Sequence, residues 1–115
     1  MAISEFEIKR CERELEKFLA IYRPPAHIRN EVDIGYRIKD QSVEIFEIRP
    51  GWKDKSEKTE TPVAKTTYVK RQGVWRVFWH MSDIKWHGYE PAPEVSSIEE
   101  FLALVGEDKH CCFFG

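Results

Sequence analysis

One stretch of the chain, Tyr68–Pro91, limits the choice of fold more than any other. It carries three of the four tryptophans, two of the four histidines and two of the four tyrosines. Large rings stabilise a small domain chiefly when they are buried. We therefore expect this stretch to form the centre of a sheet that the other elements cover.

Residues Val74–His80 alternate as a β-strand does, with bulky groups on both sides. Successive side chains point to opposite faces of a strand. One face would carry Trp75, Val77 and Trp79, and the other Val74, Arg76, Phe78 and His80. Since both faces carry bulky groups, the strand is expected to be internal. The rings are interpreted first as core, and the alternative is an exposed stacking platform.

Turns and further strands are expected on both sides of this strand. Lys70–Gly73 suits a tight turn in which Gly73 takes a positive φ. Pro62–Lys70 is expected to be the incoming strand, Met81–Asp83 a second turn, and Ile84–Tyr89 the next strand. The result is a meander with aromatic pairs across its strands.

Two amphipathic helices are predicted at the ends of the chain. Ser4 with Glu7, and Ser97 with Glu100, have the spacing of a capping box. The apolar residues that follow recur at helical spacing. They are Ile8, Cys11, Leu15, Phe18, Leu19 and Tyr22 in the first helix, and Ile98, Phe101, Leu102 and Val105 in the second.

Helix ends are indicated by proline and glycine. The first helix should end near Tyr22, because Pro24 and Pro25 follow, and a short helical turn is expected over Ala26–Asn30. Gly106 is expected to end the second helix.

The remaining segments predict two more strands and a loop. Val32–Lys39 alternates between apolar and polar residues, and Val43–Arg49 has Val43 and Ile45 facing opposite to Phe46 and Ile48. Gly51–Thr61 is polar and is expected to be a mobile loop, anchored if Trp52 docks. The tail 107–115 ends in two phenylalanines and is expected to dock on its own domain or on a second copy.

The predicted fold is an α+β domain of two layers. A five-stranded antiparallel sheet is flanked by an N-terminal and a C-terminal helix, mainly on one face, and a single domain spans residues 1–115. The other face of the sheet would be open to a partner, a ligand or solvent.

Composition fits a folded soluble domain. The chain has 42% hydrophobic and 33% charged residues and a formal net charge of -2, so no global field attracts nucleic acid. The charged N-terminus lacks the apolar run of a secretory signal, and we expect neither a membrane span nor export from the cytoplasm. Three cysteines suit no disulfide framework, and Cys11 is expected to be a small core residue.

Several short motifs spread along the chain resemble those of a known family. They are RPPAHIR at 23–29, GY at 35–36, FEIRPGW at 46–52, PVAK at 62–65, the tryptophans at 75 and 79, KWHGYEP at 85–91 and CFFG at 112–115. With these residues the chain resembles a family of short bacterial proteins catalogued only as a domain of unknown function. The resemblance covers nearly the whole chain and implies a small stand-alone bacterial protein. It supplies no activity, cofactor or catalytic residue.

A cluster of cationic side chains is predicted where the first helix meets the sheet. If Arg23, His27, Arg29 and Arg49 converge, the arginines could clamp an anion and His27 could carry a proton. The competing and favoured interpretation is that the arginines pair with Glu31, Asp33 or Glu47 and only tie the helix end to the sheet.

Metal chemistry is poorly supported by the spacing of the candidate ligands. These are His80, His87, His110, Cys111 and Cys112. Structural zinc sites normally show paired ligands two to four residues apart. No nucleotide-binding or hydrolase motif is present either, and we expect neither a metal nor a cofactor.

Basic and aromatic residues are interleaved in residues 62–91. Lys65, Lys70, Arg71, Arg76 and Lys85 accompany Tyr68, Trp79, Trp86 and Tyr89. Such a surface can bind single-stranded nucleic acid if rings and charges share a face. Long basic side chains also cover rings in proteins that bind nothing.

These observations leave three hypotheses. The first is a non-enzymatic binding or protein-interaction module that uses an aromatic sheet face, with a protein partner or a second copy of the chain bound there. The alternatives are single-stranded nucleic-acid binding, and a small enzyme for an anionic substrate with His27 as acid or base. The candidate ligand-binding residues are Arg23, His27, Arg29, Arg49, Lys65, Trp79, Trp86, His87 and Tyr89.

Overall fold

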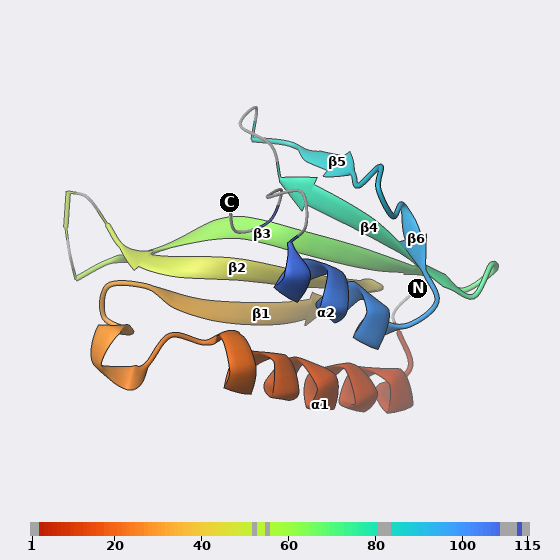
Figure 1. The fold of residues 1–115 in the computed structure, drawn as a ribbon, viewed down its shortest axis with the longest axis horizontal. Helices are drawn as coiled ribbons and strands as arrows, with labels where there is room; N and C mark the ends of the chain where they lie inside the picture. Colours follow the sequence, from red (N-terminus) through yellow and green to blue (C-terminus); the bar gives the residue numbers. More distant parts are fainter. Residues whose placement is uncertain (1–2, 52, 55, 81–83, 109–112, 114–115) are drawn as a thin grey trace.

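A computed structural model describes residues 3–51, 53–54, 56–80, 84–108 and 113 (Figure 1). The elements in chain order are helix α1 (Glu5–Tyr22), the 3-10 turn η1 (Ala26–Ile28), strands β1 (Asp33–Lys39), β2 (Ser42–Pro50), β3 (Lys58–Val69), β4 (Val74–His80), β5 (Trp86–Gly88) and β6 (Glu94–Val95), and helix α2 (Ile98–Glu107).

The strands form one antiparallel sheet. Its order is β1-β2-β3-β4-β5, with β6 paired to β4 beside the short β5. From β1 to β5 each strand follows its neighbour along the chain, as hairpin connections require. Gly73 in the β3–β4 turn has a φ of +65°. The predicted α+β class and the five-stranded antiparallel sheet between terminal helices are confirmed.

The bounds of two strands were predicted wrongly, and a third strand was not predicted. β3 begins at Lys58, so the end of the polar segment 51–61 is strand, because residues 58–61 pair with 47–50 of β2. β5 is shorter than the predicted Ile84–Tyr89, and Ile84 has a φ of +64°. β6 was missed, since two residues after a proline-rich segment show no periodicity.

A β-bulge interrupts the pairing of β2 with β3. Ile45 is opposite Ala64 while Phe46 is opposite Pro62, so Val63 is the extra residue of β3. Both Val63 and Ala64 are buried. A bulge increases local twist and bends the strand.

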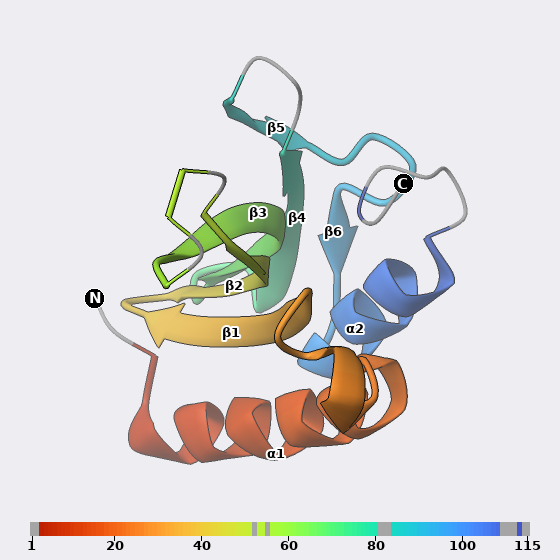
Figure 2. The same cartoon turned by 90° about the vertical axis from the view of Figure 1, so that its left-hand side faces the viewer.

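Both helices pack on the same face of the sheet. One core cluster joins Cys11, Leu15 and Phe18 of α1 and Ile98, Phe101, Leu102 and Val105 of α2 to Val43, Ile45, Val63, Ala64, Trp75 and Val77 of the sheet. Figure 2 shows α1 beneath β1 and α2 beside β4 and β6. The two-layer arrangement is therefore confirmed, and Trp75 is core at 4% exposure.

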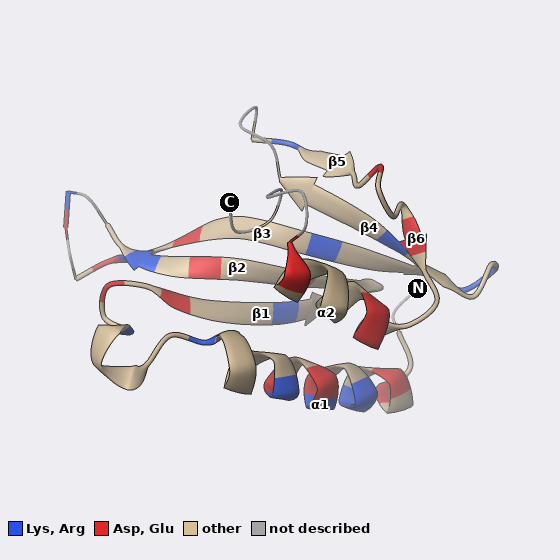
Figure 3. Ribbon diagram, in the orientation of Figure 1, with Lys and Arg blue, Asp and Glu red and all other residues tan. Residues whose placement is uncertain are grey.

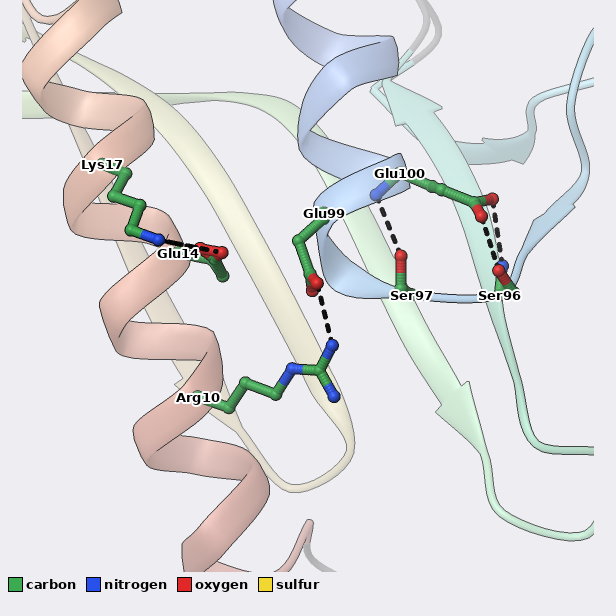
Figure 4. Close-up of polar contacts among 7 residues, drawn as sticks. All are labelled: Arg10, Glu14, Lys17, Ser96, Ser97, Glu99 and Glu100. Atoms are coloured by element: carbon green, nitrogen blue, oxygen red, sulfur yellow. Dashed lines mark hydrogen bonds and ion pairs between the residues drawn. The ribbon is translucent and has the colours of Figure 1, made fainter.

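The helix N-termini have the predicted serine caps. The Ser4 and Ser97 hydroxyls accept hydrogen bonds from the backbone N–H groups of Glu7 and Glu100, at 3.3 and 3.2 Å. The hydrogen-bond partner of the Glu100 carboxylate differs from that of the predicted capping box. Figure 4 shows it accepting from the Ser96 backbone N–H and hydroxyl, 3.3 and 2.5 Å away, instead of returning to Ser97.

An ion pair connects the two helices at their exposed edges. The Arg10 guanidinium lies 2.8 Å from the Glu99 carboxylate (Figure 4). It holds the pKa of that carboxyl below its usual range. Both side chains are about two-fifths exposed, and such pairs contribute little because water and salt screen them. The apolar cluster beneath this pair must supply most of the helix–helix attachment.

Gly106 does not end α2, contrary to prediction. The helix continues to Glu107 and is capped by Asp108 in the left-handed region, with a φ of 44°. Gly106 instead makes room for α1, because a Cβ there would overlap the Tyr22 hydroxyl and lie 2.6 Å from its Cζ. Gly106 is therefore needed for the close packing of α2 against Tyr22 and not for ending the helix.

The effect of Gly106→Ala on the free energy of unfolding is expected to change sign when Tyr22 is removed. In the native chain it should lower the free energy of unfolding by about 1 kcal/mol through overpacking. In a Tyr22→Ala background it should raise that free energy by about 0.5–1 kcal/mol, because alanine favours a helix over glycine. Urea unfolding of the four chains measures both values. The same sign in both backgrounds would contradict the contact.

The described part of the C-terminal tail docks on its own domain. Phe113 is 7% exposed, and its ring lies 4.8 Å from that of Tyr89. Its backbone N–H donates to Asp108 Oδ1 at 3.0 Å. The predicted turn 81–83, the anchoring Trp52 and the other aromatic of the tail, Phe114, lie outside the described residues.

Within the described residues, neither helix combines the length and apolar character that a bilayer-spanning helix requires.

Candidate functional site

The face of the sheet turned away from the helices, here called the outer face, is identified by the strand register. Tyr36, Ile45, Ala64 and Trp79 are opposite one another across β1–β4 and belong to the core or pack against it. The neighbouring row is Arg37, Glu44, Lys65 and Phe78. Because side chains alternate, this second row must point outward.

Aromatic rings gather on the outer face. Phe46 of β2 and Phe78 of β4 alternate with inward residues, and Trp86 of β5 is opposite His80. Phe46 is only 7% exposed, although it lies outside the core cluster. Its ring fills the space over Gly35, where a Cβ would lie 2.9 Å from Phe46 Cε2.

Cationic side chains of the outer face lie over these rings. The Arg37 guanidinium is 4.6 Å from the centre of the Phe46 ring and also forms an ion pair with Glu60. The Lys65 ammonium is 5.2 Å from the centre of Phe78 and 4.9 Å from that of Trp86. These distances are within the range of cation–π attraction. Rings and charges therefore share this face.

A small hollow separates two of the rings. It has a volume of about 90 Å³, and its lining includes Phe46, Pro62 and Trp86, with Arg37, Glu44 and Glu60 around them. The His80 ring meets the Trp86 ring edge to face, with the ring centres 5.1 Å apart. A slot between aromatic walls can accept a flat or narrow group and hold it by stacking.

Three of the predicted ligand-binding residues lie elsewhere. Trp79 is opposite His87 on the inner side of β4–β5, and both line a hollow of about 560 Å³ together with Tyr89 and Pro91. Tyr89 itself is 2% exposed and belongs to the core. Of the predicted set, the structure brings together Lys65 with Trp86, and separately Trp79 with His87 and Tyr89.

The predicted arginines each have a partner of their own. Arg23 makes two hydrogen bonds to the Asp33 carboxylate, at 2.7 and 2.8 Å, which hold the pKa of Asp33 below its usual range. Arg29 Nε donates to the Pro24 carbonyl at 2.8 Å. Arg49 pairs with Glu47 at 3.0 Å. These contacts tie the helix end and the strand end to their surroundings.

His27 lies exposed on η1. The contacts of the described residues do not join it to Arg29 or Arg49, so the anion clamp with His27 as acid or base stays a hypothesis. The contacts of Arg23 with Asp33 and of Arg49 with Glu47 are of the kind that the competing structural interpretation predicted, whereas Arg29 bonds a backbone carbonyl.

The candidate metal ligands are separated by the register. His80 is opposite Trp86 and His87 is opposite Trp79. Because side chains alternate, His80 lies on the outer face and His87 on the inner one. Among the described residues no three His, Cys, Asp or Glu side chains cluster in a way that could hold a metal ion. His110, Cys111 and Cys112 lie outside those residues.

Sequence reasoning missed Arg37, Phe46, Pro62 and Phe78 as members of the candidate site. The alternation of β2 and β4 already placed Phe46 and Phe78 on the side opposite Val43, Ile45 and Trp75. Ring size favours the tryptophans as site residues. The face of the strand on which a ring lies is the better guide to the site, because the helices cover only one face of the sheet.

Comparison with known proteins places the chain in a family without revealing a relative of known role. No curated protein matches it, and no solved structure does. A family model described as "Domain of unknown function (DUF3024)" matches residues 3–115, and the chain therefore belongs to this family.

Proposed function

We propose that this domain is a non-enzymatic binding module and that the outer face is its recognition surface. The observation that carries the proposal is the position of Phe46, Phe78 and Trp86. Their rings lie on the side opposite both helices and are overlaid by Arg37 and Lys65.

The character of this surface supports recognition over a purely structural role. The fold already has a core cluster on the inner face that joins both helices to the sheet, so the outer rings are additional to it. Aromatic and arginine side chains are enriched at the centres of binding surfaces. The slot between Phe46 and Trp86 offers a place where a partner's side group can be enclosed.

Small organic probes are expected to find this surface without knowledge of the natural partner. In a titration with indole followed by ¹H–¹⁵N NMR, the largest shift changes should occur at Phe46, Lys65 and the Trp86 indole N–H. A planar apolar probe gains most from a slot with aromatic walls. The variant Trp86→Leu should remove these changes.

A matched control keeps this result specific. Phe6 on α1 is 76% exposed, so Phe6→Ala also removes an exposed ring but should leave the shift changes unaltered. Thermal unfolding of each variant shows that it is folded. Another hollow lies between α1 and α2, and its lining includes Ile21, Tyr22 and Leu102. Shift changes centred on that hollow, or scattered over the whole surface, would contradict the proposal.

A further inference from the structure

We propose that the ligand of the outer face is single-stranded nucleic acid. The bases would stack on Phe78 and Trp86, which are only partly buried, and the phosphates would lie along the cations beside them. This inference rests on the proposed function, since it names the ligand of the same surface.

The charges of the outer face are distributed unevenly along the strands. Arg37 and Lys65 lie in the same outward row as Phe78. The next outward row, two residues along each strand, contains Lys39 and Arg76. Two residues of a strand span about 6.7 Å. Beyond this row comes the β3–β4 turn with Lys70 and Arg71. Figure 3 shows the basic segments of β1, β3, β4 and this turn on the same half of the sheet.

Acidic groups on the face offset only part of this charge. On the basic half they are Asp40 in the β1–β2 turn, Glu44 between Arg37 and Lys65, and Glu94 opposite Arg76. Arg37 is also the partner of Glu60. Six basic side chains against these four acidic ones leave an excess of two positive charges, although the whole chain has a net charge of -2.

The two acidic groups at the other end of the outer face each have a cationic partner. Glu60 pairs with Arg37, and Asp33 pairs with Arg23. A polyanion is therefore attracted to one half of the face, beside the rings.

Lys65 connects the rings to the cations. Its ammonium lies over both Phe78 and Trp86, where it shields the rings from water when no ligand is bound. Its flexible four-carbon stem lets the ammonium move aside when a base stacks there. The charge then stays within reach of the phosphate of that nucleotide.

This geometry favours single strands over a duplex. Stacking requires an exposed base face, which a double helix conceals. Because every base has a π-face, binding through rings and phosphates tolerates most sequences. The carboxylates of Glu44 and Glu60 at the slot repel phosphate and confine the backbone to the basic half.

The test is fluorescence anisotropy of the full chain with labelled oligothymidylate and oligouridylate of about ten nucleotides. A matched DNA duplex serves as the comparison. With two phosphate contacts, raising the salt from about 50 to about 200 mM should weaken single-strand binding about 7-fold. The duplex should bind more weakly at each salt concentration.

Variants separate the two contributions. Trp86→Leu should weaken single-strand binding by about 5- to 150-fold, which is the range for loss of one stacked base. Lys65→Gln should weaken it and make the slope of log K against log salt shallower by about 0.7. The charge-matched control Lys9→Gln, on the exposed surface of α1, should change affinity by no more than about 2-fold, because it lies across the fold and is screened.

Three results would overturn the inference: no salt-sensitive binding of either oligonucleotide, tighter binding of the duplex, or equal effects of Lys65→Gln and Lys9→Gln. If oligonucleotides fail while indole still binds at Trp86, the outer face is a recognition surface for another class of partner, such as a protein or a second copy of this chain. If indole fails as well, the proposed function fails with it.

Discussion

Replacing Trp75 with alanine is expected to lower the free energy of unfolding by about 3–5 kcal/mol. Trp75 is 4% exposed, its ring lies 4.9 Å from that of Tyr68, and it is opposite Val95 of β6. Removing the indole leaves a cavity among β3, β4 and β6 that these elements cannot fully close. Urea unfolding, followed by circular dichroism, measures the loss.

The neighbouring residue provides the control for this effect. Arg76 is exposed on the outer face of the same strand, so Arg76→Ala should change the free energy of unfolding by less than about 0.5 kcal/mol. A loss of less than about 1 kcal/mol for Trp75→Ala would mean that this ring does not serve the core. The identification of the inner face, and with it that of the outer face, would then be wrong.

The Cys11 thiol is expected to react with a disulfide reagent about 100-fold more slowly in the folded protein than in the unfolded chain at pH 8. Cys11 is fully buried between α1 and the sheet. Burial, followed by the charge of Glu7, raises the pKa of Cys11 from 9.0 to about 11. Only the thiolate reacts, and two pKa units reduce its fraction about 100-fold at this pH.

The measurement requires a chain in which Cys11 is the sole thiol. Cys111→Ser with Cys112→Ser provides it, and the same chain in denaturant gives the reference rate. Folded and unfolded rates within about 10-fold of each other would contradict the burial of Cys11.

The same shift predicts a pH dependence of stability. Well below pH 9 the thiol is protonated in both states and contributes no slope. Between pH 9 and about 11 the unfolded chain releases a proton that the folded chain retains, so stability contributed by this group is lost as the pH rises. Cys11→Ala should abolish this part of the slope, which isolates it from other groups that titrate in the same range.

Part of the candidate site could be predicted, because strand alternation is a local property. The period-2 pattern of β4 correctly separated Trp75 and Val77 from Phe78, and that of β2 correctly separated Val43 and Ile45 from Phe46. What the pattern could not supply was which set faces the helices. Both faces of β4 carry large side chains, so burial could not be assigned from that strand alone.

The contact of Lys65 with Phe78 and Trp86 belongs to the tertiary structure. The Lys70–Gly73 turn sets the register that places Lys65 opposite Phe78, but the approach of Trp86 to the same ammonium depends on where β5 pairs with β4. The bulge at Val63 adds to the difficulty, because one extra residue changes which side chains of β3 share a face. For the same reason Pro62 could not be placed beside Phe46.

The amino-acid sequence by itself determined the two serine-capped helices, the alternating strands and the α+β class, since helix caps and side-chain periodicity act within a few residues. Only the tertiary structure decided the extension of β3, the addition of β6, the role of Gly106 and the gathering of Phe46, Phe78 and Trp86 under Arg37 and Lys65. These depend on pairings between distant segments, where one shift in register moves every side chain to the opposite face.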